Sequence, residues 1–151
     1  MIQRIQSIYL LCVAVLMCVT VISPFATFVD DDGRYFQLES CGMILGSNYL
    51  YSTWGMCVAG LLSAGLAVTE IFCYKNRKRQ LGMSKINTVL ILLFYVVATI
   101  YACLGQREYL LEFESFAYGA ILPIIALIFN LLAFVKIKKD EKLVRSLDRI
   151  R

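Results

Sequence analysis

The sequence has no histidine, and charged residues make up only 17% of its 151 residues. Histidine is a common ligand of zinc and haem and the base of the Ser-His-Asp triad, so such sites are poorly supplied here. The chain also lacks a Cys-x-x-Cys pair and a Gly-x-Ser-x-Gly motif, which argues against further metal and hydrolase chemistry. These absences predict a protein without a metal, a cofactor or an enzymatic activity.

The shortage of charge accompanies a mean hydropathy of +0.71. Soluble proteins carry about 25% charged residues, so this composition is typical of a membrane protein. Four apolar runs approach the roughly 20 residues that a helix needs to cross about 30 Å of hydrocarbon. They cover residues 5–28, 54–74, 87–104 and 117–135. The sequence therefore predicts one all-α domain, a bundle of four transmembrane helices.

The positive charges are distributed unevenly between these runs. All but two of the 15 Lys and Arg precede the first run, lie between the second and third, or follow the fourth; the exceptions are Arg34 and Arg107. Since short cytoplasmic loops are enriched in Lys and Arg, both termini should face the cytoplasm. The net charge of +4 is then explained by topology and does not indicate nucleic-acid binding. We expect the partner to be anionic lipid of the inner leaflet, another protein or a second copy of the chain.

The last segment, residues 136–151, is polar but contains a regular apolar stripe. Its apolar residues from Leu143 to Ile150 repeat at helical spacing, which predicts an amphipathic cytoplasmic helix. Such a helix lies on the anionic leaflet, docks on a partner or on the connection at residues 75–85, or stays disordered. The candidate lipid or partner face comprises Lys75, Arg77, Lys78, Arg79, Lys138, Lys139, Arg145 and Arg149.

A second group of candidates lies inside the predicted spans. Glu70 is the only acid within a span, where a charged side chain costs about 2.5–3.5 kcal/mol at the helix centre. Three interpretations are open: it pairs with Arg4 or a loop cation, it binds a proton or cation, or it is exposed at the interface. Asn87 and Asn130 lie at similar depth. The candidate intramembrane polar layer comprises Arg4, Gln6, Glu70, Asn87 and Asn130.

The second span contains small residues at helical spacing, namely Gly55, Ala59, Ser63 and Ala67. Small residues let helix backbones approach closely where the lipid supplies no hydrophobic driving force. We therefore expect the second span to be the central packing helix.

The first connection alternates apolar and polar residues on both sides of Asp32-Gly33, a favoured hairpin turn. The pattern predicts a short extracytoplasmic β-hairpin with strands at residues 26–30 and 34–39. A third strand near residues 43–45 is an option.

Six cysteines are present, and those inside spans behave as small apolar residues. Cys41 lies in the first connection, and we expect it to be unpaired. A bridge from Cys41 to Cys57 or Cys103, both near the outer ends of their helices, is the alternative.

Both ends of the chain are distinctive. The start "MIQRIQSIYLL", the loop "YKNRKRQ" and the end "LPIIALIFNLLAFVKIKKDEKLVRSLDRIR" resemble a family of small four-span bacterial membrane proteins, typical of Bacteroidetes, that is known only as a domain of unknown function. The resemblance covers essentially the whole chain. It implies an inner-membrane location and supplies no activity, cofactor or partner. The positions that carry it are Gln3, Arg4, Gln6, Asn76, Arg77, Asn130, Asp140, Glu141, Arg145, Asp148 and Arg149.

Two functions follow as expectations. The first is a non-enzymatic accessory or scaffold subunit that presents a basic cytoplasmic face to a membrane complex or to anionic lipid. The alternative is a small transporter or ion-handling protein that uses Glu70 and Asn130.

Overall fold

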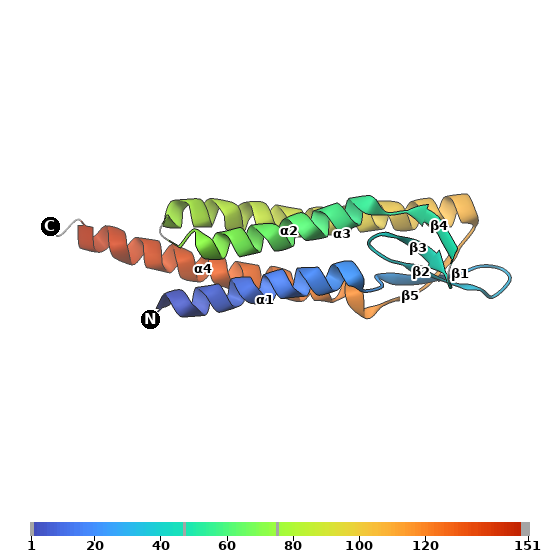
Figure 1. Cartoon of the computed structure of the whole chain (residues 1–151), viewed down its shortest axis with the longest axis horizontal. Helices are drawn as coiled ribbons and strands as arrows, with labels where there is room; N and C mark the ends of the chain where they lie inside the picture. The colour runs from blue at the N-terminus through green and yellow to red at the C-terminus, as the bar shows by residue number, and fades with distance from the viewer. Residues whose placement is uncertain (1, 47, 75, 149–151) are drawn as a thin grey trace.

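Four long helices form an antiparallel bundle that is capped at one end by a small sheet (Figure 1). The computed structural model describes residues 2–46, 48–74 and 76–148, without the side chains of residues 2–4 and 145–148. The helices are α1 (Ile2–Ile22), α2 (Trp54–Phe72), α3 (Arg77–Tyr109) and α4 (Leu122–Asp148). Helix α1 packs against α2 and α4, and α3 packs against the same two helices. All four are long and apolar enough to cross a membrane, which confirms the predicted number of such helices.

The helices meet along seams with alternating three- and four-residue steps. This spacing keeps one stripe of each helix facing its neighbours in a bundle. The seam of α3 consists of Gln80, Ser84, Asn87, Ile91, Phe94 and Ala98. The seam of α4 consists of Ala126, Asn130, Ala133, Ile137 and Asp140. The α3 seam is apolar towards the sheet and polar towards the termini, whereas the α4 seam has the polar residues Asn130 and Asp140 among apolar ones.

The outer surface of the bundle is apolar. Ile8, Leu62, Val89 and Ile128, one from each helix, are all more than half exposed. A soluble helical bundle would place such side chains in its core and polar ones outside. In this bundle the polarity is reversed over the length of the helices.

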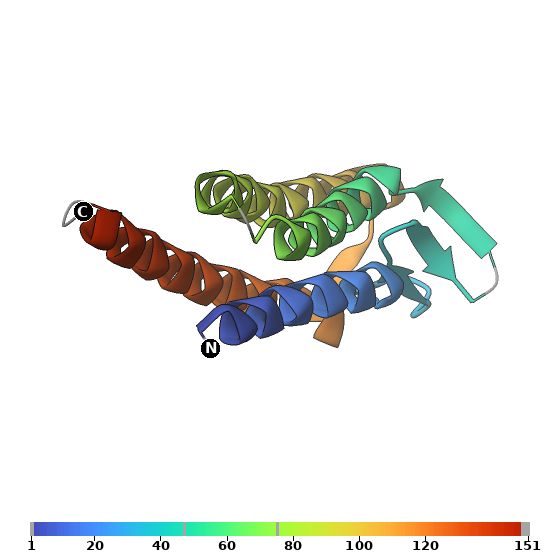
Figure 2. The same cartoon turned by 60° about the vertical axis from the view of Figure 1, so that its left-hand side comes forward.

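The sheet lies at the end of the bundle away from the two termini (Figure 2). It is antiparallel and has the strand order β4-β3-β2-β1-β5. Its strands are β1 (Ala26–Val29), β2 (Tyr35–Leu38), β3 (Gly42–Leu45), β4 (Asn48–Ser52) and β5 (Glu112–Phe116). Strands β1 and β2 pair with Val29 opposite Tyr35, and the turn between them contains Gly33 at φ 75°. The predicted hairpin at Asp32-Gly33 and the optional third strand are confirmed. Strands β4 and β5 were not predicted, because neither the aromatic segment nor the short third connection shows a clear alternation.

Two helix boundaries differ from those that the predicted spans imply. Helix α1 ends at Ile22 and not at residue 28, because Pro24 lacks a backbone N–H and disfavours helix in the residue before it. Helix α3 begins at Arg77 and not at residue 87, and the Asn76 side chain caps it by accepting from the Arg79 N–H at 3.4 Å. The segment predicted as a cytoplasmic loop is therefore largely the first turns of α3.

The fourth helix corrects the prediction for the C-terminal tail. Helix α4 runs without a break from Leu122 to Asp148, after a short 3-10 turn at Tyr118–Ala120. Residues 136–148 therefore continue the bundle helix and do not form a separate helix (Figure 1). The reason lies in the seam, because Ile137 and Asp140 remain buried beyond the apolar run.

Candidate functional site

A cluster of hydrogen-bonded amides and hydroxyls lies in the interior of the bundle, and we call it the amide cluster. Its members are Ser63 of α2, Ser84, Asn87 and Thr88 of α3, and Asn130 of α4. The amide nitrogen of Asn130 donates to the Ser84 carbonyl at 3.0 Å and to the Thr88 hydroxyl at 2.9 Å. Its amide oxygen accepts from Ser84 Oγ and Asn87 Nδ2, both at 3.5 Å. The Ser63 hydroxyl donates to Asn87 Oδ1 at 2.6 Å, so the cluster links three helices.

Glu70 follows Ser63 by seven residues on α2, towards the termini, and is completely buried. Neither of its carboxyl oxygens has a hydrogen-bond partner among the residues that the structure describes. The Ser84 hydroxyl is near the carboxyl but outside hydrogen-bond geometry. Gln80 donates instead to the backbone carbonyl of Glu70, at 3.2 Å. The hydrogen-bonding capacity of the Glu70 carboxyl is therefore unmet among the described residues, and burying a charge without a partner is costly.

A third polar group joins the helices at the end that carries the termini. Asp140 of α4 accepts a hydrogen bond from Gln6 Nε2 of α1 at 3.3 Å. The guanidinium of Arg77, from α3, donates to the Asp140 carbonyl at 2.9 Å and lies 3.8 Å from its carboxylate. We call this group the Asp140 clamp. It joins α1, α3 and α4 at this end of the bundle.

The predicted single polar layer is therefore divided. Asn87 and Asn130 are in contact, as expected, but Gln6 binds Asp140 and is part of the clamp. Glu70 makes no side-chain hydrogen bond to any of the described members of the layer. The side chain of Arg4 lies outside the described residues, so its predicted pairing with Glu70 stays a prediction.

The basic face is exposed at the same end of the bundle. Lys78, Arg79, Lys138 and Lys139 are exposed, whereas Arg77 is held in the clamp. Lys75 and Arg149 and the side chain of Arg145 lie outside the described residues. Among the described residues, no group of three or more metal-ligating side chains is brought together.

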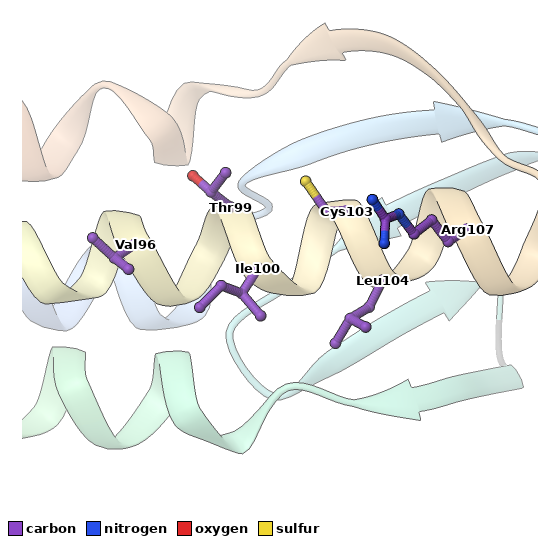
Figure 3. Close-up of a pocket in the computed structure, with 6 residues that line it drawn as sticks. All are labelled: Val96, Thr99, Ile100, Cys103, Leu104 and Arg107. Atoms are coloured by element: carbon purple, nitrogen blue, oxygen red, sulfur yellow. The ribbon is translucent and has the colours of Figure 1, made fainter.

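An open groove of about 460 Å³ runs along α3 near the sheet (Figure 3). It is lined by Val96, Thr99, Ile100, Cys103, Leu104 and Arg107. Its walls are mostly apolar, with Thr99 and Arg107 as the polar residues of the lining. They belong to the same outward-facing surface as the rest of the helix. The groove contains no pair of groups suited to acid–base or nucleophilic chemistry.

The family assignment rests on a match that covers residues 2–150. The chain belongs to the family described as Domain of unknown function (DUF4293). No curated protein matches the chain. Several positions that carry the resemblance to this family make the contacts described above. Gln6, Arg77 and Asp140 form the clamp, and Asn130 is the centre of the amide cluster.

Gln80, Ser84 and Thr88 make hydrogen bonds in the interior but were not predicted as site residues. Gln80 and Ser84 precede Asn87 by seven and three residues, so the three share one stripe of a helix. That spacing was a usable signal. It was overlooked because these positions were assigned to a loop.

Proposed function

We propose that this chain is an integral protein of a bacterial inner membrane, with both termini in the cytoplasm, and that it is a non-enzymatic accessory or scaffold subunit. The observation that carries the proposal is the reversed polarity of the bundle. Side chains such as Leu62 and Val89 face outwards, while Asn87 and Asn130 are completely buried. Lipid is a suitable solvent for this surface, and hydrogen bonds between helices then hold the interior together.

The scaffold role is supported by the basic end of the bundle. Lys78 and Arg79 begin α3, and Lys138 and Lys139 project from the final turns of α4. The Asp140 clamp lies between these two sets and fixes the spacing of the helices that carry them. A rigid basic platform next to an anionic leaflet suits a membrane complex or lipid headgroups.

The test is purification of the full chain from native membranes in mild detergent, with quantification of the proteins and phospholipids that accompany it. The double variant Lys138→Gln and Lys139→Gln should bind an anionic partner about 30-fold more weakly, at about 1 kcal/mol for each basic residue near the surface. The control is Arg107→Gln, which removes an exposed basic residue at the opposite end. Equal retention by all three proteins, or no partner and no anionic lipid at all, would contradict the scaffold.

Orientation has its own test. A single cysteine at position 78, in a chain without its native cysteines, should react with a membrane-impermeant maleimide only after the inner membrane is opened. Labelling of this position in intact spheroplasts would show that the orientation is reversed.

A second candidate is an ion-handling protein, and the buried carboxyl of Glu70 favours it. Since neither oxygen has a partner among the described residues, a proton or a small cation would complete the site. The nearby Ser84 hydroxyl supplies a further oxygen atom, and oxygen atoms are ligands for hard cations.

Flux separates the two candidates. Glu70→Gln preserves the shape of the side chain and deletes its charge. If the chain handles ions, proteoliposomes of the parent protein should show pH-dependent proton or cation flux that Glu70→Gln abolishes. If it is a scaffold, the two proteins should show the same background flux. Stability does not decide the matter, because no described counter-charge is lost in the variant.

A further inference from the structure

Two cysteines from different elements meet at the sheet end of the bundle. Cys41 follows β2 in the turn before β3, and Cys57 lies in the first turns of α2. Two backbone hydrogen bonds join these segments: the Thr53 N–H donates to the Cys41 carbonyl at 3.3 Å, and the Cys57 N–H donates to the Ser40 carbonyl at 3.1 Å. These two bonds hold the start of α2 against the turn that contains Cys41.

The two side chains are also neighbours. The Cys41 thiol lies beside the Cys57 thiol, and both are free thiols in the structure. Cys41 is exposed and Cys57 partly exposed. The Cys41 thiol is therefore the more accessible of the two to a protein in solution. Cys103, the alternative partner considered for Cys41, lies elsewhere, in a cavity that it shares with Phe28 and Phe113.

We propose that Cys41 and Cys57 are a redox pair, closed as a disulfide by exchange with an oxidised dithiol protein of the extracytoplasmic space. The Cys41 thiolate attacks one sulfur of the carrier disulfide and expels the other as a thiolate. The Cys57 thiolate then attacks Cys41 and releases the second carrier sulfur. Two electrons pass to the carrier, and the two protons of the cysteine thiols end on its dithiol. The bond fastens the turn between β2 and β3 to α2.

The pair is tested on the purified full chain in mild detergent, in a buffer of oxidised and reduced glutathione. Free thiols are then blocked with N-ethylmaleimide, and the protein is digested with chymotrypsin. This protease cuts after Tyr49, Tyr51 and Trp54, whereas trypsin finds no Lys or Arg between the two cysteines. We expect a Cys41 peptide linked to a Cys57 peptide, lighter than the two separate peptides by two hydrogens.

Matched variants define the pair. Cys103→Ser should retain the linked peptide, and both Cys41→Ser and Cys57→Ser should lose it. Reduction should lower the melting temperature of the oxidised parent and leave that of Cys57→Ser unchanged, because only the parent loses a cross-link. A lasting glutathione adduct on Cys41 beside a free Cys57, or a bridge from Cys41 to Cys103, would overturn the proposal.

The placement of the two cysteines in the extracytoplasmic space rests on the orientation given under the proposed function. An experiment in whole cells distinguishes a wrong orientation from a wrong redox pair. Whole cells are quenched with acid, which stops thiol–disulfide exchange, and free thiols are then blocked. The protein is purified and digested as before, and the digest is searched for the linked peptide. Its presence supports the proposal. If the peptide is absent although labelling at position 78 shows the proposed orientation, the redox pair is wrong and the proposed function stands. If position 78 is labelled from outside, the orientation is wrong, and the result with purified protein still judges the pair.

Discussion

Replacement of Asn130 by leucine tests whether the amide cluster holds the bundle together. Asn130 makes two short bonds to α3, at 3.0 Å to the Ser84 carbonyl and at 2.9 Å to the Thr88 hydroxyl. Hydrogen bonds between transmembrane helices are worth about 0.6 kcal/mol each on average, so the two contribute about 1.2 kcal/mol. The variant also leaves the Asn87 amide without its acceptor, which costs about 1 kcal/mol more. We expect Asn130→Leu to lower the free energy of unfolding by about 2 kcal/mol.

The measurement is equilibrium unfolding in mixed micelles, in which a mild detergent is progressively replaced by sodium dodecyl sulfate and helicity is followed by circular dichroism. Leucine adds no compensating hydrophobic gain, because detergent and lipid chains are as apolar as leucine. An Asn130→Leu protein as stable as the parent, or more stable, would refute the structural role of the cluster.

A double-mutant cycle with Thr88→Val isolates one of the bonds. The coupling between Asn130 and Thr88 should be about 0.6 kcal/mol. Thr99→Val is the matched control: each threonine donates to the carbonyl four residues earlier, Thr88 to Ser84 and Thr99 to Tyr95. Since Thr99 has no described contact with Asn130, its coupling should be zero within error. Equal coupling for both threonines would show that the effect is propagated through the helix.

Two further predictions use the same unfolding assay. Tyr51→Phe removes the bond from the Tyr51 hydroxyl to the Tyr101 carbonyl at 2.8 Å and should cost about 1 kcal/mol. Burial is the larger cause that raises the pKa of Tyr51 to about 12, and the charges of Tyr109, Glu108 and Tyr101 add to it. As the pH rises, the unfolded chain therefore loses the Tyr51 proton at a lower pH than the folded chain does. Stability should therefore fall between about pH 10 and 12, less steeply in Tyr51→Phe; identical pH profiles would contradict this. Gly60→Ala places a methyl 2.5 Å from Val21 Cγ2 and should cost about 1–2 kcal/mol by overpacking. Gly65→Ala, on the same helix with nothing within 4 Å, should be neutral or stabilising; an equal loss in both would mean that helix packing is not the cause.

The sequence alone determined the number of long apolar helices and the turn at Asp32-Gly33. These features are local: an apolar stretch of about 20 residues indicates a long apolar helix, and an Asp-Gly pair between two strands favours a hairpin turn. The boundaries were less well determined. Pro24 does mark where α1 stops, but the charged residues after Asn76 are good helix formers, so their polarity was mistaken for a loop.

The tertiary structure decided which polar residues meet. Depth along the predicted spans put Gln6, Glu70, Asn87 and Asn130 in one layer. In the structure Gln6 contacts Asp140, and the Glu70 carboxyl makes no hydrogen bond to either asparagine. Depth gives a position along a helix axis, but contact also requires the rotation of each helix and its axial offset from its neighbours, which are set by packing along the whole seam.

Likewise, Cys41 had two candidate partners in the sequence. The fold of the sheet onto α2 brings Cys57 to it and leaves Cys103 in another cavity, because strand pairing fixes distances between residues that the chain separates.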